Sequence, residues 1–377
     1  MASSLDTLQV LDFSRVLAGP FATMMLADLG ARVTKIERPG TGDDTRSWGP
    51  PYDDRGEASY FHSVNRNKDS LVLDLTVPAD LERARLLAST ADVVVENFRP
   101  GVMDRLGLGY DTLTAANPGL IYCSVTGFGR GAGAALPGYD LLVQALGGLM
   151  SITGAPDGEP QKAGVAVVDV LAGLFATVGI LAALQHRTTS GQGQRVEVDL
   201  LSALLAALVN QGSSFTVAGV VPTRMGNQHP SIAPYEVLPT SEGNLVLAIG
   251  TDRQFAAFCQ VVGAPELATD PRFATNPARV EHRVALRHNL VGLLSGRPAD
   301  TWSGLLAPAG VPAGAVNTID RAFRLAADLG LDPIVDLPRP DGSTVSLTSN
   351  PIRLSATPVV YRSAPPRLGE GATGWPG

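Results

Sequence analysis

Asp169 is the residue of this 377-residue chain whose type and position most clearly suggest chemistry. It lies near the start of a very apolar run, residues 165–184, which is typical of a buried helix. The partial positive charge at a helix N-terminus favours an ionised carboxylate, whereas burial alone would raise its pKa. We therefore expect an ionised, partly buried carboxylate, which is a usable nucleophile toward an activated acyl group. A carboxylate that only bonds the first backbone amides of the helix would give the same spacing, so the pattern by itself leaves both interpretations open.

Other patterns with recognisable chemistry are weak or missing in the sequence. Glycine clusters at 127–133, 147–148 and 191–193 could contact phosphate, but none forms GxGxxG after an early strand or GxxxxGK followed by Ser or Thr. There is no HExxH and no GxSxG, and the five histidines are scattered. Cys123 and Cys259 do not form a CxxC spacing. The sequence therefore predicts no metal site and no disulfide framework.

Composition limits the classes of partner. Hydrophobic residues make up 45% and charged residues 17%, which allows a large core, and the net charge of -7 argues against nucleic acid. The chain does not open with a basic segment followed by an apolar one, so we expect no signal peptide. Residues 165–184 are long enough to cross a bilayer, but Asp169 would be costly there. We expect a cytoplasmic protein with no membrane partner.

The elements that must position Asp169 alternate in type along the first third of the chain. Strands are expected at 8–13, 32–37, 70–75, 92–98 and 120–125, with helices at 20–29 and 80–89. Longer helices are expected at 139–150, 169–185 and 199–212, and a strand leading into a helix at 244–259. Strands separated by helices predict parallel βαβ units in an open α/β sheet, whose ligands collect at the carboxyl ends of the strands.

Seven short motifs follow one another along nearly the whole chain. They are Phe13-Ser-Arg-Val-Leu-Ala-Gly-Pro, Val33-Thr-Lys-Ile-Glu-Arg-Pro-Gly, Asn65-Arg-Asn-Lys, Glu96-Asn-Phe-Arg-Pro-Gly, Pro137-Gly-Tyr-Asp, Val167-Val-Asp-Val-Leu-Ala-Gly and Gly191-Gln-Gly-Gln. Together they resemble the family III coenzyme A transferases, also called the carnitine/bile-acid-inducible family, which includes formyl-CoA transferase.

This resemblance implies a fold and an assembly. The fold is α/β, with a Rossmann-like large domain and a smaller α+β domain, in two interlocked subunits of a homodimer. The large domain would take residues 1–205 and 316–377, and the small domain residues 206–315.

The resemblance also assigns roles to individual residues. Asp169 would attack the donor thioester, giving a mixed anhydride and then an enzyme-bound CoA thioester. CoA would be a substrate, with no permanently bound cofactor. The residues expected around CoA are Val16, Leu17 and Ala18 through their backbone, Arg38, Asn65, Lys68, Asn97, Phe98 and Arg105, with Tyr139 beside the nucleophile. Cations suit the phosphates and an aromatic ring suits the base.

The substrate is less constrained. Trp48 matches a position lining the acyl pocket, and Gly226, Asn227, Gln228 and His229 occupy the place of an active-site glycine loop. This stretch resembles the branch that uses succinyl-CoA with dicarboxylates such as glutarate, and Arg46 and His229 could meet a distal carboxylate. Oxalate, carnitine-like and aromatic acids stay open.

Two alternatives to CoA transfer are weighed. The 2-methylacyl-CoA racemases of the same family need two acid/base groups, which would align with Tyr139 and approximately with Asp252. Tyrosine, with an ordinary pKa of about 10, is a poor base at neutral pH, so the transferase is favoured. A protein that only binds CoA would have no need for a carboxylate at position 169.

Overall fold

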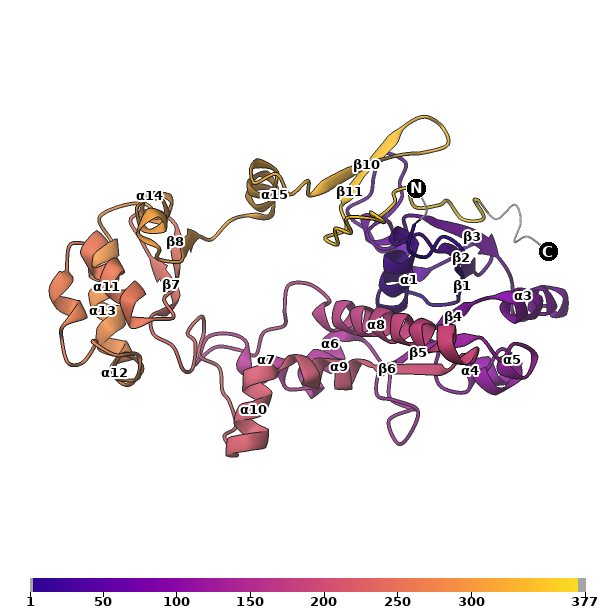
Figure 1. Ribbon diagram of the computed structural model, residues 1–377, viewed down its shortest axis with the longest axis horizontal. Helices are drawn as coiled ribbons and strands as arrows, with labels where there is room; N and C mark the ends of the chain where they lie inside the picture. Colours follow the sequence, from indigo (N-terminus) through magenta and orange to yellow (C-terminus); the bar gives the residue numbers. More distant parts are fainter. Residues whose placement is uncertain (1–2, 372–377) are drawn as a thin grey trace. The chain divides into compact units, whose positions relative to one another are not determined.

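The computed structural model describes residues 3–371 and divides into two compact units (Figure 1). The large unit consists of Met1–Leu149, Ala163–Val220 and Asp332–Gly377, and the small unit of Met150–Lys162 and Val221–Leu331. The small unit therefore begins later and ends later than the expected 206–315, and it includes an extra segment before Asp169. The chain passes between the units four times, because the segment at 150–162 interrupts the large unit.

A six-stranded parallel sheet forms the centre of the large unit and confirms the expected α/β class. Its strands are β1 (Gln9–Asp12), β2 (Arg32–Glu37), β3 (Lys68–Val72), β4 (Val93–Glu96), β5 (Ile121–Thr126) and β6 (Arg195–Asp199). They lie in the order β3-β2-β1-β4-β5-β6, and every neighbouring pair is parallel. The order reverses between β1 and β4. The loops that leave these two strands diverge there, which creates a crevice at the carboxyl edge of the sheet.

Helices cover both faces of this sheet (Figure 1). One face packs against α1 (Ala18–Asp28), α8 (Val167–Ser190) and α9 (Leu200–Ala207). The other packs against α3 (Pro78–Thr90), α4 (Val102–Arg105) and α5 (Tyr110–Ala116). Successive strand side chains point to opposite faces, so Val10 joins the first core and Leu11 the second. Because both faces are buried, central strands such as β4, Val-Val-Val-Glu, are largely apolar.

The remaining elements of the large unit are short. They are η1 (Asp44–Ser47), α2 (Ser59–His62), α6 (Asp140–Leu146), α10 (Val209–Ala218) and an antiparallel pair, β10 (Ile334–Pro338) and β11 (Thr344–Thr348). Helix α7 (Leu149–Ile152) lies where the chain leaves the large unit for the small one. Two helices expected to be continuous are interrupted. The expected helix at 139–150 is split at Gly147-Gly148, where Gly148 has a φ of +85°, and the one at 199–212 is split after α9.

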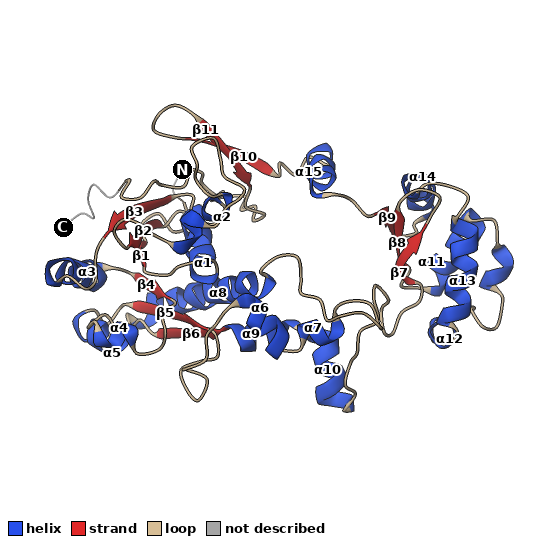
Figure 2. Cartoon of the chain, turned by 180° about the vertical axis from the view of Figure 1, so that it is seen from behind, coloured by secondary structure: helices blue, strands red, loops and turns tan. Residues whose placement is uncertain are grey.

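The small unit has its own core (Figure 2). Its antiparallel sheet contains β7 (Tyr235–Pro239), β8 (Asn244–Ala248) and β9 (Ala313–Ala315). Its helices are α11 (Asp252–Val261), η2 (Pro265–Ala268), α12 (Asn276–Glu281), α13 (Arg283–Leu294), α14 (Ala299–Leu306), η3 (Ala307–Ala309) and α15 (Ile319–Asp328). Phe255, Phe258, Leu290 and Trp302 are buried between them.

Helix α8, which carries Asp169, is a core helix of the large unit. By length and composition it is apolar enough to cross a membrane, with a hydropathy of 2.3. Yet Ala172, Ala176 and Ile180 form a stripe at helical spacing that is fully buried against the sheet and α1. This packing accounts for the buried part of the apolar window, 39% of it, as in the core helix of a globular unit.

Gly173 lets α1 approach α8 one turn after Asp169. A Cβ added at Gly173 would lie 2.7 Å from the carbonyl oxygen of Ala18 and 3.1 Å from the Phe21 ring. We expect Gly173→Ala to lower the free energy of unfolding by about 1–3 kcal/mol, because the added methyl overpacks this contact. Urea unfolding followed by circular dichroism measures it. Gly292→Ala in α13 is the matched control, since its Cβ meets open space and a helical alanine is favoured there. Equal stability changes for the two variants would contradict the packing role.

Candidate active site

A cavity of about 340 Å³ opens at the reversal point of the sheet. It is lined by the segments that follow β1, β4 and β5, together with the start of α6 and of α8. Residues expected from the sequence that share this cavity are Val16, Leu17, Ala18, Asn97, Phe98, Tyr139 and Asp169. Arg38 lines a neighbouring cavity, which shares Arg15 and Phe98 with the first. The structure thus brings the expected nucleophile and much of the expected CoA site to one crevice.

The carboxylate of Asp169 is more basic than the sequence suggested. Burial, and then the negative charge of Asp140, raises the pKa of Asp169 to about 7. Burial and the Asp140 charge thus work against the ionisation expected from the N-terminus of α8. The physical reason is that Asp140 occupies that position: its Oδ1 accepts hydrogen bonds from the backbone N–H of Val168 at 2.8 Å and of Asp169 at 3.3 Å. The amides that would have stabilised the Asp169 carboxylate are satisfied by its neighbour.

Asp140 is held by a second polar group. The buried Gln144 donates from Nε2 to Asp140 Oδ2 at 2.5 Å and accepts from the backbone N–H of Ala163 at 2.8 Å. This chain of bonds connects α6 to the segment before α8. Sequence reasoning missed Asp140, although it directly follows Tyr139 in the Pro137-Gly-Tyr-Asp motif.

A contact between two glycines places Tyr139 next to the end of β5. A Cβ on Gly138 would lie 2.6 Å from the Cα of Gly127, so neither position has room for a side chain. Gly127 directly follows β5, and Tyr139 precedes the first residue of α6. The tyrosine is 63% exposed and lines the cavity, where a substrate can reach it.

Asn97 takes a role different from that expected. Its Oδ1 accepts the Arg15 backbone N–H at 2.8 Å and its Nδ2 donates to the Arg15 carbonyl at 2.7 Å. Both ends of the amide therefore hold the segment that follows β1. The Arg15 guanidinium lies 4.9 Å from the centre of the Phe98 ring and is an additional cation at the cavity that the sequence did not single out.

Asn65 and Lys68, expected beside CoA, are instead part of the interior. The Lys68 side chain is fully buried, and its Nζ donates to Asp12 at 3.1 Å, to the Pro20 carbonyl at 2.8 Å and to Asn65 Oδ1 at 3.0 Å. Burial lowers the pKa of Lys68 to about 8. Because these bonds satisfy all three donors of the ammonium, we assign both residues a structural role.

Arg46 is likewise engaged within the chain. Its guanidinium binds Glu37 through Nε at 2.8 Å and Nη2 at 2.7 Å and stacks over the Phe61 ring at 3.7 Å. It lines a different cavity from that of Asp169, so the expected contact with a distal carboxylate would require this ion pair to open. Arg105 is exposed at the end of α4.

Trp48 contacts a second aromatic residue near the nucleophile. Its ring meets the edge of Tyr60 with centroids 5.4 Å apart. Tyr60 and Val170 pack against the same small cluster of buried side chains, and burial and then the Asp169 charge raise the pKa of the Tyr60 hydroxyl. Tyr60 was not singled out from the sequence.

The loop Gly226–His229 belongs to the small unit. Gly226 has a φ of +63° and its N–H donates to the Gly154 carbonyl at 3.0 Å. The His229 ring lies 5.3 Å from that of Tyr235, and its Nδ1 accepts the Ser231 N–H at 3.1 Å. These contacts order the loop within its own unit.

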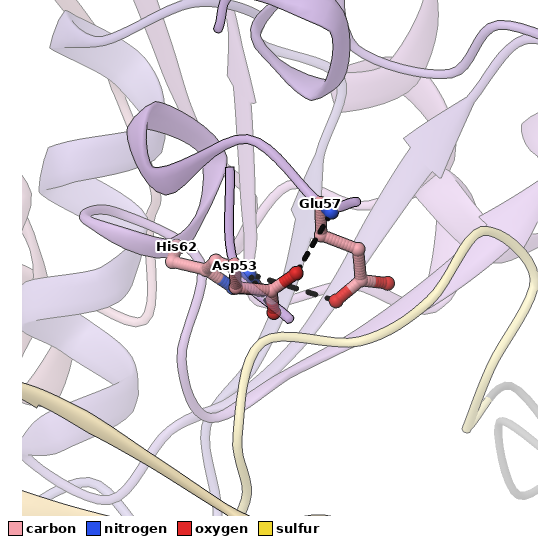
Figure 3. Close-up of side chains that lie close together, drawn as sticks. All are labelled: Asp53, Glu57 and His62. Atoms are coloured by element: carbon pink, nitrogen blue, oxygen red, sulfur yellow. Dashed lines mark hydrogen bonds and ion pairs between the residues drawn. The ribbon is translucent and has the colours of Figure 1, made fainter. Parts of the chain in front are cut away.

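Asp53, Glu57 and His62 lie close together, with possible metal-ligand atoms within 4.8 Å of one another (Figure 3). This cluster was not predicted from the sequence. The Asp53 carboxylate already accepts the backbone N–H groups of Arg55 and Glu57 at 2.9 and 2.8 Å and binds the guanidinium of Arg339. A cation placed there would be repelled by that guanidinium. We interpret the cluster as an ion-pair network between loop and tail segments of the large unit.

Comparisons with known proteins identify the family of this chain. The family model described as CoA-transferase family III matches residues 5–372. The chain is 44% identical to the succinate–glutarate CoA-transferase of Agrobacterium fabrum, over 97% of this chain and 93% of that protein. It is 42% identical to the acetyl-CoA:oxalate CoA-transferase of Acetobacter aceti, over 93% of this chain and 89% of that protein. A crystal structure of a CAIB/BAIF family protein from Brucella suis, 43% identical, matches with a TM-score of 0.88 over 98% of this chain and 97% of that one.

The racemase alternative is not favoured, because the named relatives transfer CoA. Asp252, which that alternative needs as an acid/base group, lies in the small unit, where its Oδ1 accepts from the buried Arg279 at 2.7 Å. The match across nearly the whole chain, the fold and the position of Asp169 agree: the chain belongs to CoA-transferase family III and is a CoA-transferase.

Proposed function

We propose that this enzyme moves CoA from succinyl-CoA to a second dicarboxylic acid, with Asp169 as the nucleophile. The observation that carries the proposal is the half-buried Asp169 carboxylate in the crevice lined by Val16, Leu17 and Ala18. A pKa of about 7 leaves a substantial ionised fraction at neutral pH, and the desolvated carboxylate is a stronger nucleophile than one in water. The acids named for the relatives from A. fabrum and A. aceti, glutarate and oxalate, support a dicarboxylate acceptor.

The proposed reaction divides one exchange into four acyl transfers. An Asp169 oxygen attacks the donor carbonyl carbon, and the C–S bond breaks to give a mixed anhydride and CoA thiolate. The thiolate attacks the aspartyl carbonyl, which releases the donor acid as its carboxylate and leaves CoA as a thioester on Asp169. The acceptor carboxylate then displaces the thiolate to form a second anhydride, and the thiolate attacks the acceptor carbonyl of that anhydride. This yields the new acyl-CoA and regenerates the Asp169 carboxylate, with no net proton or electron consumed.

The side chains around the crevice suit the two ends of CoA. Arg15 and Arg38 provide cations, and Phe98 provides a ring face, at the outer cavity that adjoins the one holding Asp169. We assign the nucleotide to this outer cavity and the thioester to the inner one, where Tyr139 is a donor for an acyl oxygen. In this assignment the rings of Trp48 and Tyr60 lie beside the acyl group. The loop Gly226–His229, with His229 as a candidate contact for a distal carboxylate, remains our proposal for acceptor recognition.

The experiment that tests the function is detection of new acyl-CoAs by liquid chromatography and mass spectrometry. Purified protein is mixed with succinyl-CoA and a panel containing glutarate, oxalate, mesaconate and monocarboxylic acids, with Asp169→Ala in parallel. We expect a new thioester of a dicarboxylic acid from the wild type alone. Transfer only to monocarboxylic acids would contradict the proposed substrate class, and the same products from Asp169→Ala would contradict the proposed nucleophile.

We further propose a cytoplasmic homodimer, on the basis of the family resemblance and of exposed apolar side chains in the large unit. Phe175 and Val178 of α8 are 44% and 64% exposed, and Val217 of α10 is 85% exposed. Apolar groups gathered on one unit are typical of a subunit interface. Light scattering during size-exclusion chromatography should give about twice the chain mass of 39.2 kDa. A mass equal to one chain at micromolar concentration would contradict the dimer.

A further inference from the structure

Val16, in the wall of the crevice, has a backbone conformation that its side chain disfavours. Its φ is +68°, in the left-handed region. A β-branched residue rarely adopts this conformation, which is strained and persists only where surrounding groups enforce it. The surroundings of residues 14–16 therefore need an explanation.

Asp43 and Lys35 hold one side of this segment. The Asp43 carboxylate accepts the Val16 backbone N–H at 3.3 and 3.2 Å through its two oxygens. Lys35 Nζ binds Asp43 Oδ2 at 2.8 Å and donates to the Ser14 carbonyl at 2.7 Å. Both charged side chains are fully buried, and Thr45 adds hydrogen bonds to Asp43 from its N–H at 3.0 Å and its hydroxyl at 2.8 Å.

Asn97 holds the other side. Its amide bonds the N–H and the carbonyl of Arg15, so side chains satisfy the Ser14 carbonyl, both polar groups of Arg15 and the Val16 N–H. The backbone of residues 14–16 is thus bound at successive polar groups by side chains from β2, from the loop after β2 and from the residue that follows β4. Buried partners of this kind prevent the segment from relaxing to an unstrained conformation, because each lost bond would leave a buried group unpaired.

This segment lies opposite the nucleophile. Val16, Leu17 and Ala18 line the same cavity as Asp169, and the Ala18 carbonyl packs against Gly173, one helical turn beyond Asp169. A change at Val16 would move the backbone that faces a thioester bound at Asp169. Displacements of about 1 Å at a reacting centre can cost on the order of 100-fold in rate.

We propose that Asp43, anchored by Lys35, is a positioning residue for CoA transfer: it holds Val16 in the left-handed conformation so that the backbone of residues 16–18 is set for the thioester. This inference rests on the proposed function. Asp43 acts through the main chain, so neither the Asp43 nor the Lys35 side chain needs to touch the substrate.

A double-mutant cycle tests the inference. Asp43→Asn removes the charge that accepts the Val16 N–H, and we expect kcat per folded enzyme to fall about 10–100-fold, with a smaller change in KM for the acyl-CoA. Val16→Gly adopts the left-handed conformation without strain, and its own kcat is the reference for the double variant. In the Asp43→Asn background, Val16→Gly should restore kcat at least about 5-fold. Circular dichroism and thermal unfolding give the folded fraction of each variant.

Two further variants keep the test decisive if Asp43→Asn folds poorly because Lys35 loses its buried partner. Val16→Pro leaves the Asp43–Lys35 pair intact but forces a negative φ, so it should lower kcat by at least about 100-fold. Asp53→Asn is the matched control: it disrupts another low-pKa carboxylate, whose partners are Arg339, His62 and nearby backbone amides rather than residues 14–16. It should change stability but not kcat.

The outcomes separate this inference from the proposed function. Wild-type CoA transfer that Asp169→Ala abolishes supports the function, and the Asp43 and Val16 variants then decide the positioning role. Wild-type kcat in folded Val16→Pro, or no rescue of Asp43→Asn by Val16→Gly, would overturn it. A wild type that transfers no CoA would refute the proposed function together with this role.

Discussion

Asp169→Asn is expected to lower kcat for CoA transfer by at least about 10⁴-fold, because an amide of nearly the same shape cannot open the donor thioester. CoA affinity, measured by isothermal titration calorimetry, should stay within about 3-fold, since the nucleotide is assigned to the cavity around Phe98 and Arg38. Steady-state kinetics with succinyl-CoA and the accepted acid measure the loss.

Asp111→Asn is the control for this prediction, because the Asp111 side chain is 92% exposed. It should leave kcat unchanged. A folded Asp169→Asn enzyme that kept more than about a tenth of the wild-type kcat would show that another group forms the covalent intermediate.

The second large effect concerns pH. Burial and the Asp140 charge raise the pKa of Asp169 to about 7, so the ionised nucleophile forms only as pH rises through 7. The rate kcat/KM should therefore increase over about pH 6–8, well above the ordinary range of an aspartate. Asp140→Asn removes the neighbouring negative charge, and the ascending limb should move toward lower pH. An ascending limb of kcat/KM near pH 4 in the wild type, or an unchanged limb in Asp140→Asn, would contradict this electrostatic account.

The same shift affects stability. A carboxyl group whose pKa is higher in the folded protein than in the unfolded chain destabilises the fold as pH rises through the folded value. We expect Asp169→Asn to raise the free energy of unfolding at pH 8 by on the order of 2–4 kcal/mol relative to the wild type. The difference should vanish below about pH 4, where the carboxyl is neutral in both states. Urea unfolding at the two pH values measures it, and a variant less stable than the wild type at pH 8 would contradict the prediction.

The sequence predicted the first five strands of the sheet and missed the sixth. The first two strands and the helix between them, and the strands near 93 and 121, match the structure within a few residues. β6 was missed because Arg195-Val-Glu-Val-Asp alternates polar and apolar residues at the edge of the sheet. The interruption at Gly147-Gly148 was missed because the apolar pattern continues across it.

The site was predictable where a motif carries the chemistry. Asp169, Tyr139 and the 16–18 backbone were found through their motifs and share one cavity. Asp43 and Asp140 were not found, because each acts by accepting backbone N–H groups from residues about 27–29 positions away, a pairing that only the fold reveals.

Lys68 and Arg46 were assigned to ligand contacts for a similar reason. A lysine or arginine in a motif predicts a contact with the ligand. Whether its side chain is instead buried depends on a partner elsewhere in the chain. Lys68 pairs with Asp12, 56 positions away, and Arg46 pairs with Glu37 beneath the loop between them. Only the packed structure distinguishes a buried ion pair from a phosphate contact.

The most direct test of the central claim is peptide mass spectrometry of enzyme mixed with succinyl-CoA and quenched rapidly. The account predicts a CoA adduct, bound as a thioester, on the side chain of Asp169 in the wild type. The adduct should be lost on treatment with hydroxylamine and absent from Asp169→Asn. An active wild type that forms no adduct under these conditions, or one that carries it on another residue, would contradict the assignment of Asp169 as the nucleophile.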